Sequence, residues 1–249
     1  LGYRAGRGGQ NTAPYSSGTA NVAVGYEALQ SFTTGIHNVA VGVSAMMDET
    51  TGNYNTALGN NAMRENTTGG ANTALGYAAG FSLNGGDYNV VVGNGAGYNL
   101  AGASNCILIG DEAGNNINNT GANGTVAVGH ESGKAITSGA GNTAIGYQAG
   151  YSNLTGGYNT LLGYQAGYNL LTDNNVAIGW QALYKIGDAA GSGHGENNVA
   201  LGLAAMAGGD DTDGNNTGYK NVAVGTATLG GATRSSDGDA FTGYENVAI

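Results

Sequence analysis

A nine-residue phrase recurs along the whole chain and restricts its fold more than any other feature. The phrase reads NVAVGYEAL from Asn21, NVAVGVSAM from Asn38, NTALGNNAM from Asn55, NTAIGYQAG from Asn142 and NTLLGYQAG from Asn159. Its glycine recurs at spacings of 17 residues five times, followed by 19, 17, 17, 16, 23 and 23. Such a unit is too short for a helical pair or a propeller blade, but it matches one coil of a β-solenoid, whose turns stack about 4.8 Å apart. We therefore predict an all-β, parallel β-solenoid of about thirteen coils, mostly of 17 residues.

Composition and charge support this prediction and exclude several classes of function. The 249 residues include 49 Gly and 31 Asn, two residue types that disfavour helix interiors. With 7 Lys and Arg against 17 Asp and Glu, the chain lacks the positive surface that nucleic acids or anionic lipids require. No apolar run approaches the length of a membrane span, so we expect no membrane insertion of this segment.

Two stretches of the array differ in the length and charge of their loops. Residues 1–180 keep the short period, whereas residues 181–249 have longer and more acidic loops within the same continuous solenoid. The chain opens with LGYRAG and ends with NVAI, which are both partial repeats. We therefore expect the 249 residues to be a window on a longer array.

The predicted strand is apolar on both of its faces. We number each repeat from the asparagine that opens the phrase, position 0, so that the recurring glycine is position 4. Positions 1 and 3 are β-branched or aliphatic and share one face, while position 2 is alanine in ten of thirteen repeats. The pattern leaves open which face points inward, but either choice leaves an apolar stripe that needs a partner. We expect that stripe to be a seam between identical chains along the alanines: Ala23, Ala40, Ala57, Ala74, Ala127, Ala144, Ala177, Ala200 and Ala223.

Position 0 carries a second column of identical side chains. Asparagine fills it in eleven repeats, with Cys106 and Thr125 in the other two. Its carboxamide can bond a neighbouring turn or the same asparagine one coil away. We predict a structural ladder that includes Asn21, Asn38, Asn55, Asn72, Asn89, Asn142 and Asn159.

The phrases NVAVGYEAL, NTAIGYQAG and NVAIGWQAL, separated by Thr-Gly turns, resemble the head repeats of YadA-like trimeric autotransporter adhesins. They are also similar to related arrays in bacteriophage tail fibres. The 17-residue period favours the tail-fibre arrays, because the usual coil of an adhesin head is shorter. The resemblance covers essentially the whole chain. It implies a left-handed β-roll, a homotrimer and an extracellular location on a virion or a bacterial surface. The function it implies is a structural fibre segment that presents or contributes to receptor binding; the alternative is an adhesin head that binds host matrix or glycans.

Tyrosines supply the candidate contacts with a cell-surface glycan or protein receptor. Position 5 carries Tyr or Trp in six repeats, where the rings either stack on sugars or stack between coils and chains. The tyrosines of the turns are better receptor candidates if they project: Tyr54, Tyr88, Tyr158 and Tyr219.

No pattern in the sequence indicates catalysis, a metal site or a cofactor. The three histidines, His37, His130 and His194, occupy different repeat positions, so no catalytic cluster is expected. Acidic loops such as GGDDTDGNN lack the spacing of known calcium loops and are interpreted as solvated. A polysaccharide-cleaving tailspike remains a third alternative, with its chemistry in those loops.

Overall fold

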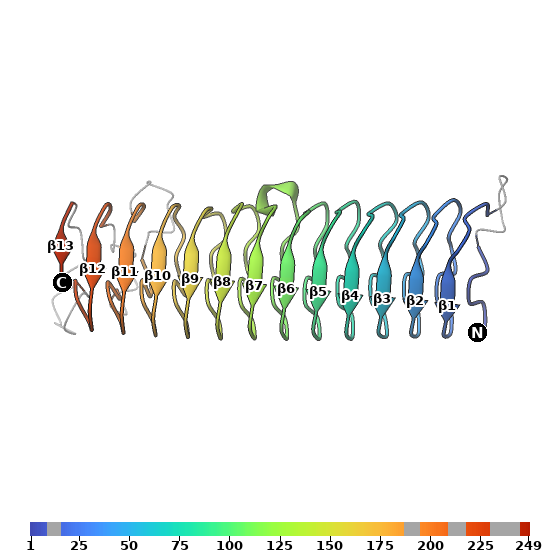
Figure 1. The fold of residues 1–249 in the computed structure, drawn as a ribbon, viewed down its shortest axis with the longest axis horizontal. Coiled ribbons are helices and arrows are strands. Elements are labelled where there is room, and N and C mark those ends of the chain that lie inside the picture. Colours follow the sequence, from blue (N-terminus) through green and yellow to red (C-terminus); the bar gives the residue numbers. More distant parts are fainter. Residues whose placement is uncertain (9–15, 187–194, 209–217, 230–244) are drawn as a thin grey trace. The chain divides into compact units, whose positions relative to one another are not determined.

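The computed structural model describes residues 1–8, 16–186, 195–208, 218–229 and 245–249. These residues form two compact units, Leu1–Gly124 and Thr125–Ile249. Both units are parallel β-solenoids, so the predicted all-β, parallel β-solenoid architecture is confirmed (Figure 1). The change in loop length predicted at residue 180 lies within the second unit.

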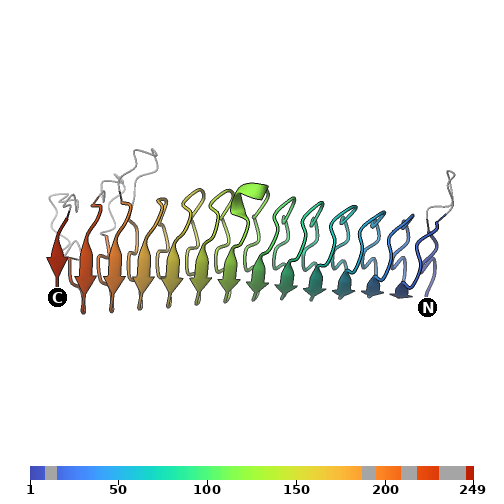
Figure 2. The same ribbon diagram turned by 45° about the horizontal axis from the view of Figure 1, so that its top comes forward.

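The first unit contains six three-residue strands and one short 3₁₀ helix among its described residues. They are β1 (Val22–Val24), β2 (Val39–Val41), β3 (Thr56–Leu58), β4 (Thr73–Leu75), β5 (Val90–Val92), β6 (Ile107–Ile109) and η1 (Thr120–Ala122). Each strand pairs in parallel with the next one along the chain, and Val22 aligns with Val39, which aligns with Thr56. Every strand occupies positions 1 to 3, so identical repeat positions lie side by side (Figure 2).

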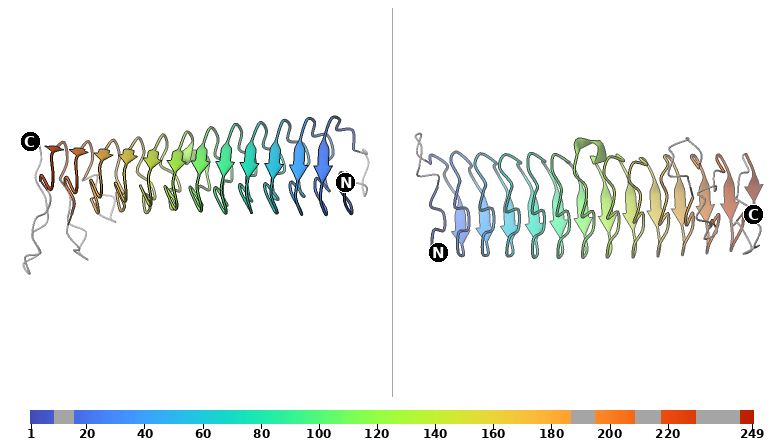
Figure 3. Two further views of the ribbon diagram at one scale, coloured as in Figure 1. Left: turned by 60° about the horizontal axis from the view of Figure 1, so that its bottom comes forward. Right: turned by 180° about the vertical axis from the view of Figure 1, so that it is seen from behind.

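The second unit repeats this arrangement with seven strands among its described residues. They are β7 (Val126–Val128), β8 (Thr143–Ile145), β9 (Thr160–Leu162), β10 (Val176–Ile178), β11 (Val199–Leu201), β12 (Val222–Val224) and β13 (Val247–Ala248). The strands remain in register where the period changes, because Val176 aligns with Thr160 at 16 residues and with Val199 at 23. The extra residues therefore lie between the strands in the sequence, while the strands of the unit keep one direction (Figure 3).

The alanine column of position 2 points into the coil, which corrects the prediction that it forms a seam between chains. Of the nine alanines, Ala40, Ala57, Ala74, Ala127, Ala144, Ala177, Ala200 and Ala223 have at most 1% of their surface exposed, and Ala23 is half-buried. A side chain that is already covered within one chain has no surface left for a second chain. Positions 1 and 3 therefore form the outer face.

The core is narrow, and the opposite wall of the coil fills most of it. In the second unit, Ala144, Ala177 and Ala200 pack with Leu161, Leu170, Leu183, Ile186 and Met206 in one buried cluster. In some repeats the large side chain is at position 8, and in others it is at position 11. Met63 at position 8 is followed by Asn66 at position 11, whereas Gly80 at position 8 is followed by Leu83 at position 11. A Cβ on Gly80 would lie 3.1 Å from Leu83 Cδ1, so Leu83 fills the space beside Gly80 in that repeat. In these two repeats the exchange keeps the interior filled, whereas the repeat of Asn175 carries large buried side chains at both positions, Leu183 and Ile186.

The glycine at position 4 is required by the distance between coils. Gly59 has φ +148°, and a Cβ there would lie 2.2 Å from the carbonyl oxygen of Gly76 in the next coil. The Gly59 N–H donates to the carbonyl of Val41 at 2.9 Å, so the backbone is held on the other side as well. A side chain at this position would have to separate the coils.

The asparagines of position 0 form a continuous chain of hydrogen bonds within each unit. The Asn72 backbone N–H donates to Asn55 Oδ1 at 2.9 Å, and the Asn89 N–H donates to Asn72 Oδ1 at 2.9 Å. Asn72 Nδ2 also donates to the Gly86 carbonyl at 2.8 Å, which ties the end of the coil to its start. The same bonds link the predicted residues Asn21, Asn38, Asn55, Asn72, Asn89, Asn142 and Asn159 to their neighbours. Cys106 continues the ladder through its backbone N–H, which donates to Asn89 Oδ1.

Candidate interaction surface

The outer face of each sheet is apolar and exposed. It is built from positions 1 and 3 of the strands, with position 5 at its border. Leu58 in β3 is 47% exposed, Leu162 in β9 is 44% exposed, and the β-branched residues Val22, Val90 and Ile107 are exposed to a similar extent. Because positions 1 and 3 repeat in register, these side chains line up from strand to strand within each unit.

The same face is nearly free of charge. Positions 1, 3 and 5 of the twelve repeats from β1 to β12 comprise three positions times twelve, or 36 residues, of which only Asp111 carries a fixed charge at pH 7. A soluble surface usually carries a charge at roughly a quarter of its positions or more, which would be about nine charges here. An apolar, uncharged and regular surface of this kind is typical of protein interfaces.

The aromatic residues at position 5 stack between coils. In the second unit His130, Tyr147, Tyr164 and Trp180 follow one another, with ring centroids 5.2, 5.1 and 6.2 Å apart. Position 9 carries a parallel stack of Tyr151, Tyr168 and Tyr184, at 5.0 and 5.4 Å. Neighbouring rings cover one another's faces in these stacks, so the parts of the rings that face outward are their edges. Of the two interpretations of position 5, stacking between coils is the one that the structure displays.

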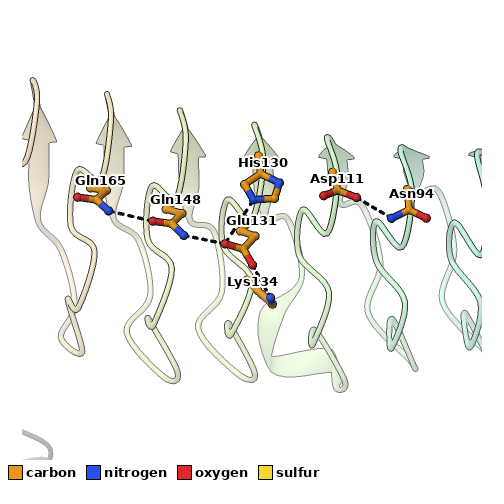
Figure 4. Close-up of polar contacts among 7 residues, drawn as sticks. All are labelled: Asn94, Asp111, His130, Glu131, Lys134, Gln148 and Gln165. Atoms are coloured by element: carbon orange, nitrogen blue, oxygen red, sulfur yellow. Dashed lines mark hydrogen bonds and ion pairs between the residues drawn. The ribbon is translucent and has the colours of Figure 1, made fainter.

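A column of polar side chains at position 6 runs between these two aromatic stacks. Gln148 Nε2 donates to Glu131 Oε2 at 2.7 Å, Gln165 Nε2 donates to Gln148 Oε1 at 2.9 Å, and Gln181 Nε2 donates to Gln165 Oε1 at 2.8 Å. At the first coil of the column, Lys134 Nζ reaches Glu131 Oε1 at 2.5 Å, and His130 Nε2 lies 3.5 Å from Oε2 (Figure 4).

The charge at this end of the column is balanced. Hydrogen bonds from Lys134 and then from Gln148 hold the pKa of the Glu131 carboxyl below its ordinary value. Glu131 is therefore ionised at neutral pH and paired with a lysine.

The predicted receptor tyrosines do not all occupy one column. Tyr54, Tyr88 and Tyr158 lie immediately before the asparagine of position 0, each with a positive φ, and are 62–68% exposed. Tyr219 lies one residue earlier in its repeat and is only half-buried, with Lys220 Nζ 5.8 Å from its ring centroid. The ring of Tyr54 stacks on the ring of His37 in the preceding coil, with their centroids 5.2 Å apart.

Sequence reasoning missed one ionisable residue, Glu49. It occupies position 11, where most repeats carry a core residue, and its side chain is completely buried. Glu49 Oε1 accepts the Gly52 N–H at 2.6 Å, and Oε2 accepts Asn66 Nδ2 at 2.6 Å and Asn55 Nδ2 at 3.3 Å. Burial raises the pKa of this carboxyl to about 7, against the opposing effect of these hydrogen bonds. The sequence does indicate this residue, because Glu49 occupies the repeat position that holds Leu83, Leu100 and Ile117 in other repeats.

The described residues contain no group of three His, Cys, Asp or Glu side chains that could hold a metal ion. The searched part of the chain also has no helix long and apolar enough to cross a membrane. Residues 209–216 of the acidic loop GGDDTDGNN and His194 fall outside the described residues.

Comparison with known proteins identifies no relative of this chain. No family model, no curated protein and no solved structure matches the chain. The resemblance to adhesin and tail-fibre repeats is therefore a hypothesis carried by the repeated phrase itself.

Proposed function

We propose that this chain is a structural segment of an extracellular fibre that assembles by self-association, in the manner of a tail-fibre shaft. The observation that carries the proposal is the exposed outer face of positions 1 and 3, which is apolar and almost uncharged in both units. The partner that fits such a face is a second copy of the same chain, because identical repeats place matching side chains at matching heights.

The energetics favour association over a stable monomer. Full burial of a Val, Leu or Ile side chain contributes about 1.5–3 kcal/mol, so a side chain that is already half-buried gains about 1 kcal/mol more in an interface. Association costs an estimated 4–15 kcal/mol in lost translational and rotational freedom. A dozen or more such side chains on the outer face can offset that cost.

The number of chains and the place of the fibre follow from the resemblance. We propose three chains per particle, a left-handed coil and an extracellular location on a virion or a bacterial surface. In this assignment the segment needs no cofactor. It holds receptor-contacting elements away from the particle, and its exposed turn tyrosines Tyr54, Tyr88 and Tyr158 add contacts of their own.

A matched pair of leucines tests the proposal. Leu162 lies on the outer face of β9 at 44% exposure, and Leu154 lies in a turn outside the strands at 46% exposure. Analytical ultracentrifugation of the full chain at micromolar concentration is expected to give the mass of three chains. We expect Leu162→Glu to shift the particle toward the monomer, because the substitution places a charge in the apolar face, whereas Leu154→Glu leaves the mass unchanged. Circular dichroism of both variants checks that the coils remain folded.

Three results would contradict the proposal in whole or in part. A monomeric wild-type chain at these concentrations would show that the outer face needs no partner. An assembly that survives Leu162→Glu, and is lost instead on Leu154→Glu, would place the interface in the turns. A stable dimer would keep self-association and overturn the trimer.

A further inference from the structure

The second unit carries a polar column that the oligomer face does not use. Glu131, Gln148, Gln165 and Gln181 occupy position 6 of four successive repeats, between the aromatic stacks of positions 5 and 9. We call this the amide column. Its four residues are half-buried, so each keeps part of its surface open to solvent.

The amide column retains hydrogen-bonding capacity after its own bonds are made. A primary amide offers two N–H donors and two acceptor lone pairs. Gln148 and Gln165 each use one N–H and one lone pair in bonds along the column. One donor and one acceptor of each of these two amides therefore remain for a ligand, at the same repeat position in two successive coils.

The spacing of the column selects the kind of polymer that matches it. Successive coils are about 4.8 Å apart, and the aromatic rings beside the amides are separated by 5.0–5.4 Å in the position 9 stack. An extended polypeptide advances about 3.3 Å per residue and presents like side chains every two residues, so it falls out of step with the coils. A pyranose unit in an extended, equatorially linked chain is close to one coil spacing in length. Successive units are turned over, so alternate units present opposite edges of the ring to the column, and both edges carry hydroxyl groups that donate and accept.

The charge around the column favours a neutral ligand. The Glu131 carboxylate is neutralised by Lys134 at 2.5 Å, and Gln148, Gln165 and Gln181 are uncharged. The chain has a net charge of −10, which disfavours acidic polysaccharides and nucleic acids.

We propose that the amide column binds an extended, neutral polysaccharide with one sugar unit per coil. The hydroxyls of the sugar exchange hydrogen bonds with the spare groups of Gln148 and Gln165, while the edges and hydroxyls of the flanking tyrosines border the chain. The sugars do not stack on the ring faces, because neighbouring rings already cover those faces. The inference rests on the receptor-contacting part of the proposed function and gives it a chemical class.

Titration calorimetry with defined oligosaccharides tests this assignment. The probes are β-1,4-linked glucose oligomers of two to six units and, as a bent chain of the same sugar, α-1,4-linked maltohexaose. We expect affinity for the β-linked series to rise with each added unit up to about four, the number of coils in the column, and then to level off. Maltohexaose is expected to bind at least tenfold more weakly, because its curvature carries it away from the column.

Alanine variants locate the site without disturbing the coil. Alanine occupies position 6 at Ala78 and Ala204 with φ +51°, close to the +52° of Gln148 and Gln165. The double variant Gln148→Ala, Gln165→Ala is expected to lose at least tenfold in affinity for the β-linked hexasaccharide. Asn94→Ala, which removes an amide that donates to Asp111 at 2.7 Å in the first unit, is the control and is expected to leave binding unchanged.

The outcomes separate this inference from the proposed fibre function. Absence of binding to every β-linked probe, equal binding of the bent chain, or full binding by the double variant would each overturn the assignment. Sedimentation of the same samples reports the assembly independently. A failed binding experiment on an intact assembly would overturn the polysaccharide site alone, whereas a monomeric chain that still binds would overturn the fibre proposal alone.

Discussion

Glu49 makes the stability of the first unit depend on pH in a direction opposite to that of an ordinary paired carboxylate. Its ordinary pKa of 4.5 rises to about 7 in the folded chain because the carboxyl is buried. In the window between these values the folded state holds a proton that the unfolded state has released. The stability contributed by Glu49 is therefore fully present below about pH 4.5 and is lost as the pH rises through about 7.

The size of the effect follows from the two pKa values. Each pKa unit corresponds to 1.36 kcal/mol, so the gap between 4.5 and about 7 amounts to about 3 kcal/mol. No solvent discount applies, because the side chain has no exposed surface. This is a large fraction of the total stability of a typical domain, which is about 5–15 kcal/mol.

Urea denaturation at pH 4.5 and pH 8, followed by hydrogen exchange in residues 46–72, measures the effect locally. Wild-type protein is expected to lose protection in this segment at the higher pH. Glu49→Gln is expected to remove most of the difference, because glutamine stays neutral at both pH values, although it is less stable overall since its NH₂ group faces the donor of Gly52 or Asn66. A direct ¹³C titration of the Glu49 carboxyl gives its pKa independently.

Glu65 provides the matched control, because it is an exposed carboxylate in the next coil, the coil that supplies Asn55 and Asn66. Glu65→Gln is expected to leave the pH dependence of residues 46–72 as it is in the wild type. Asp48, whose pKa is raised by partial burial, contributes in the same direction as Glu49, so the decisive quantity is the difference between wild type and Glu49→Gln. Equal pH dependence in these two proteins, or wild-type protection that increases with pH, would refute the reasoning.

Two further substitutions test the contacts between coils by thermal melting. Gly59→Ala is expected to lower the free energy of unfolding by more than about 4 kcal/mol, because its Cβ would lie 2.2 Å from a backbone oxygen. The control Gly85→Ala, whose Cβ would have its nearest contact at 3.7 Å, should lower it by only about 1–2 kcal/mol, because of the positive φ. Similar losses at both sites would contradict the packing argument. Asn72→Ala is expected to cost about 2–6 kcal/mol, because it leaves the buried Gly86 carbonyl and Asn89 N–H without their partner at about 1–3 kcal/mol each. Asn84→Ala, at an exposed asparagine, is the control, and a comparable loss there would mean that the ladder adds nothing particular.

The repeated phrase was sufficient to predict the strands and their alignment. Because identical residues recur at a nearly fixed spacing, stacking them in register satisfies every strand at once, and positions 1 to 3 form the strand from β1 to β12. The asparagine column was predictable for the same reason, since its carboxamide can reach only the adjacent turn or the next asparagine.

The orientation of the two strand faces was predicted less well. The sequence indicated an apolar stripe in need of a partner, but it assigned that stripe to the alanines. Glu49 was overlooked because a single glutamate in a turn is usually solvated. It is buried here because Asn55 and Asn66, from the next coil, cover it and bond to it.

The sequence alone determined that this chain stacks short coils, which residues recur in each column, and that both faces of its strand are apolar. An alternation of period two cannot say which face is inside, since the two faces are equivalent until the rest of the coil is placed. Only the tertiary structure decided it: the opposite wall brings Met, Leu and Ile side chains into the interior, such as Met63 and Leu83, opposite small strand residues such as Ala57 and Ala74. A larger strand residue, Leu161, is buried where the opposite wall carries Gly167. The larger side chains of positions 1 and 3 therefore point outward.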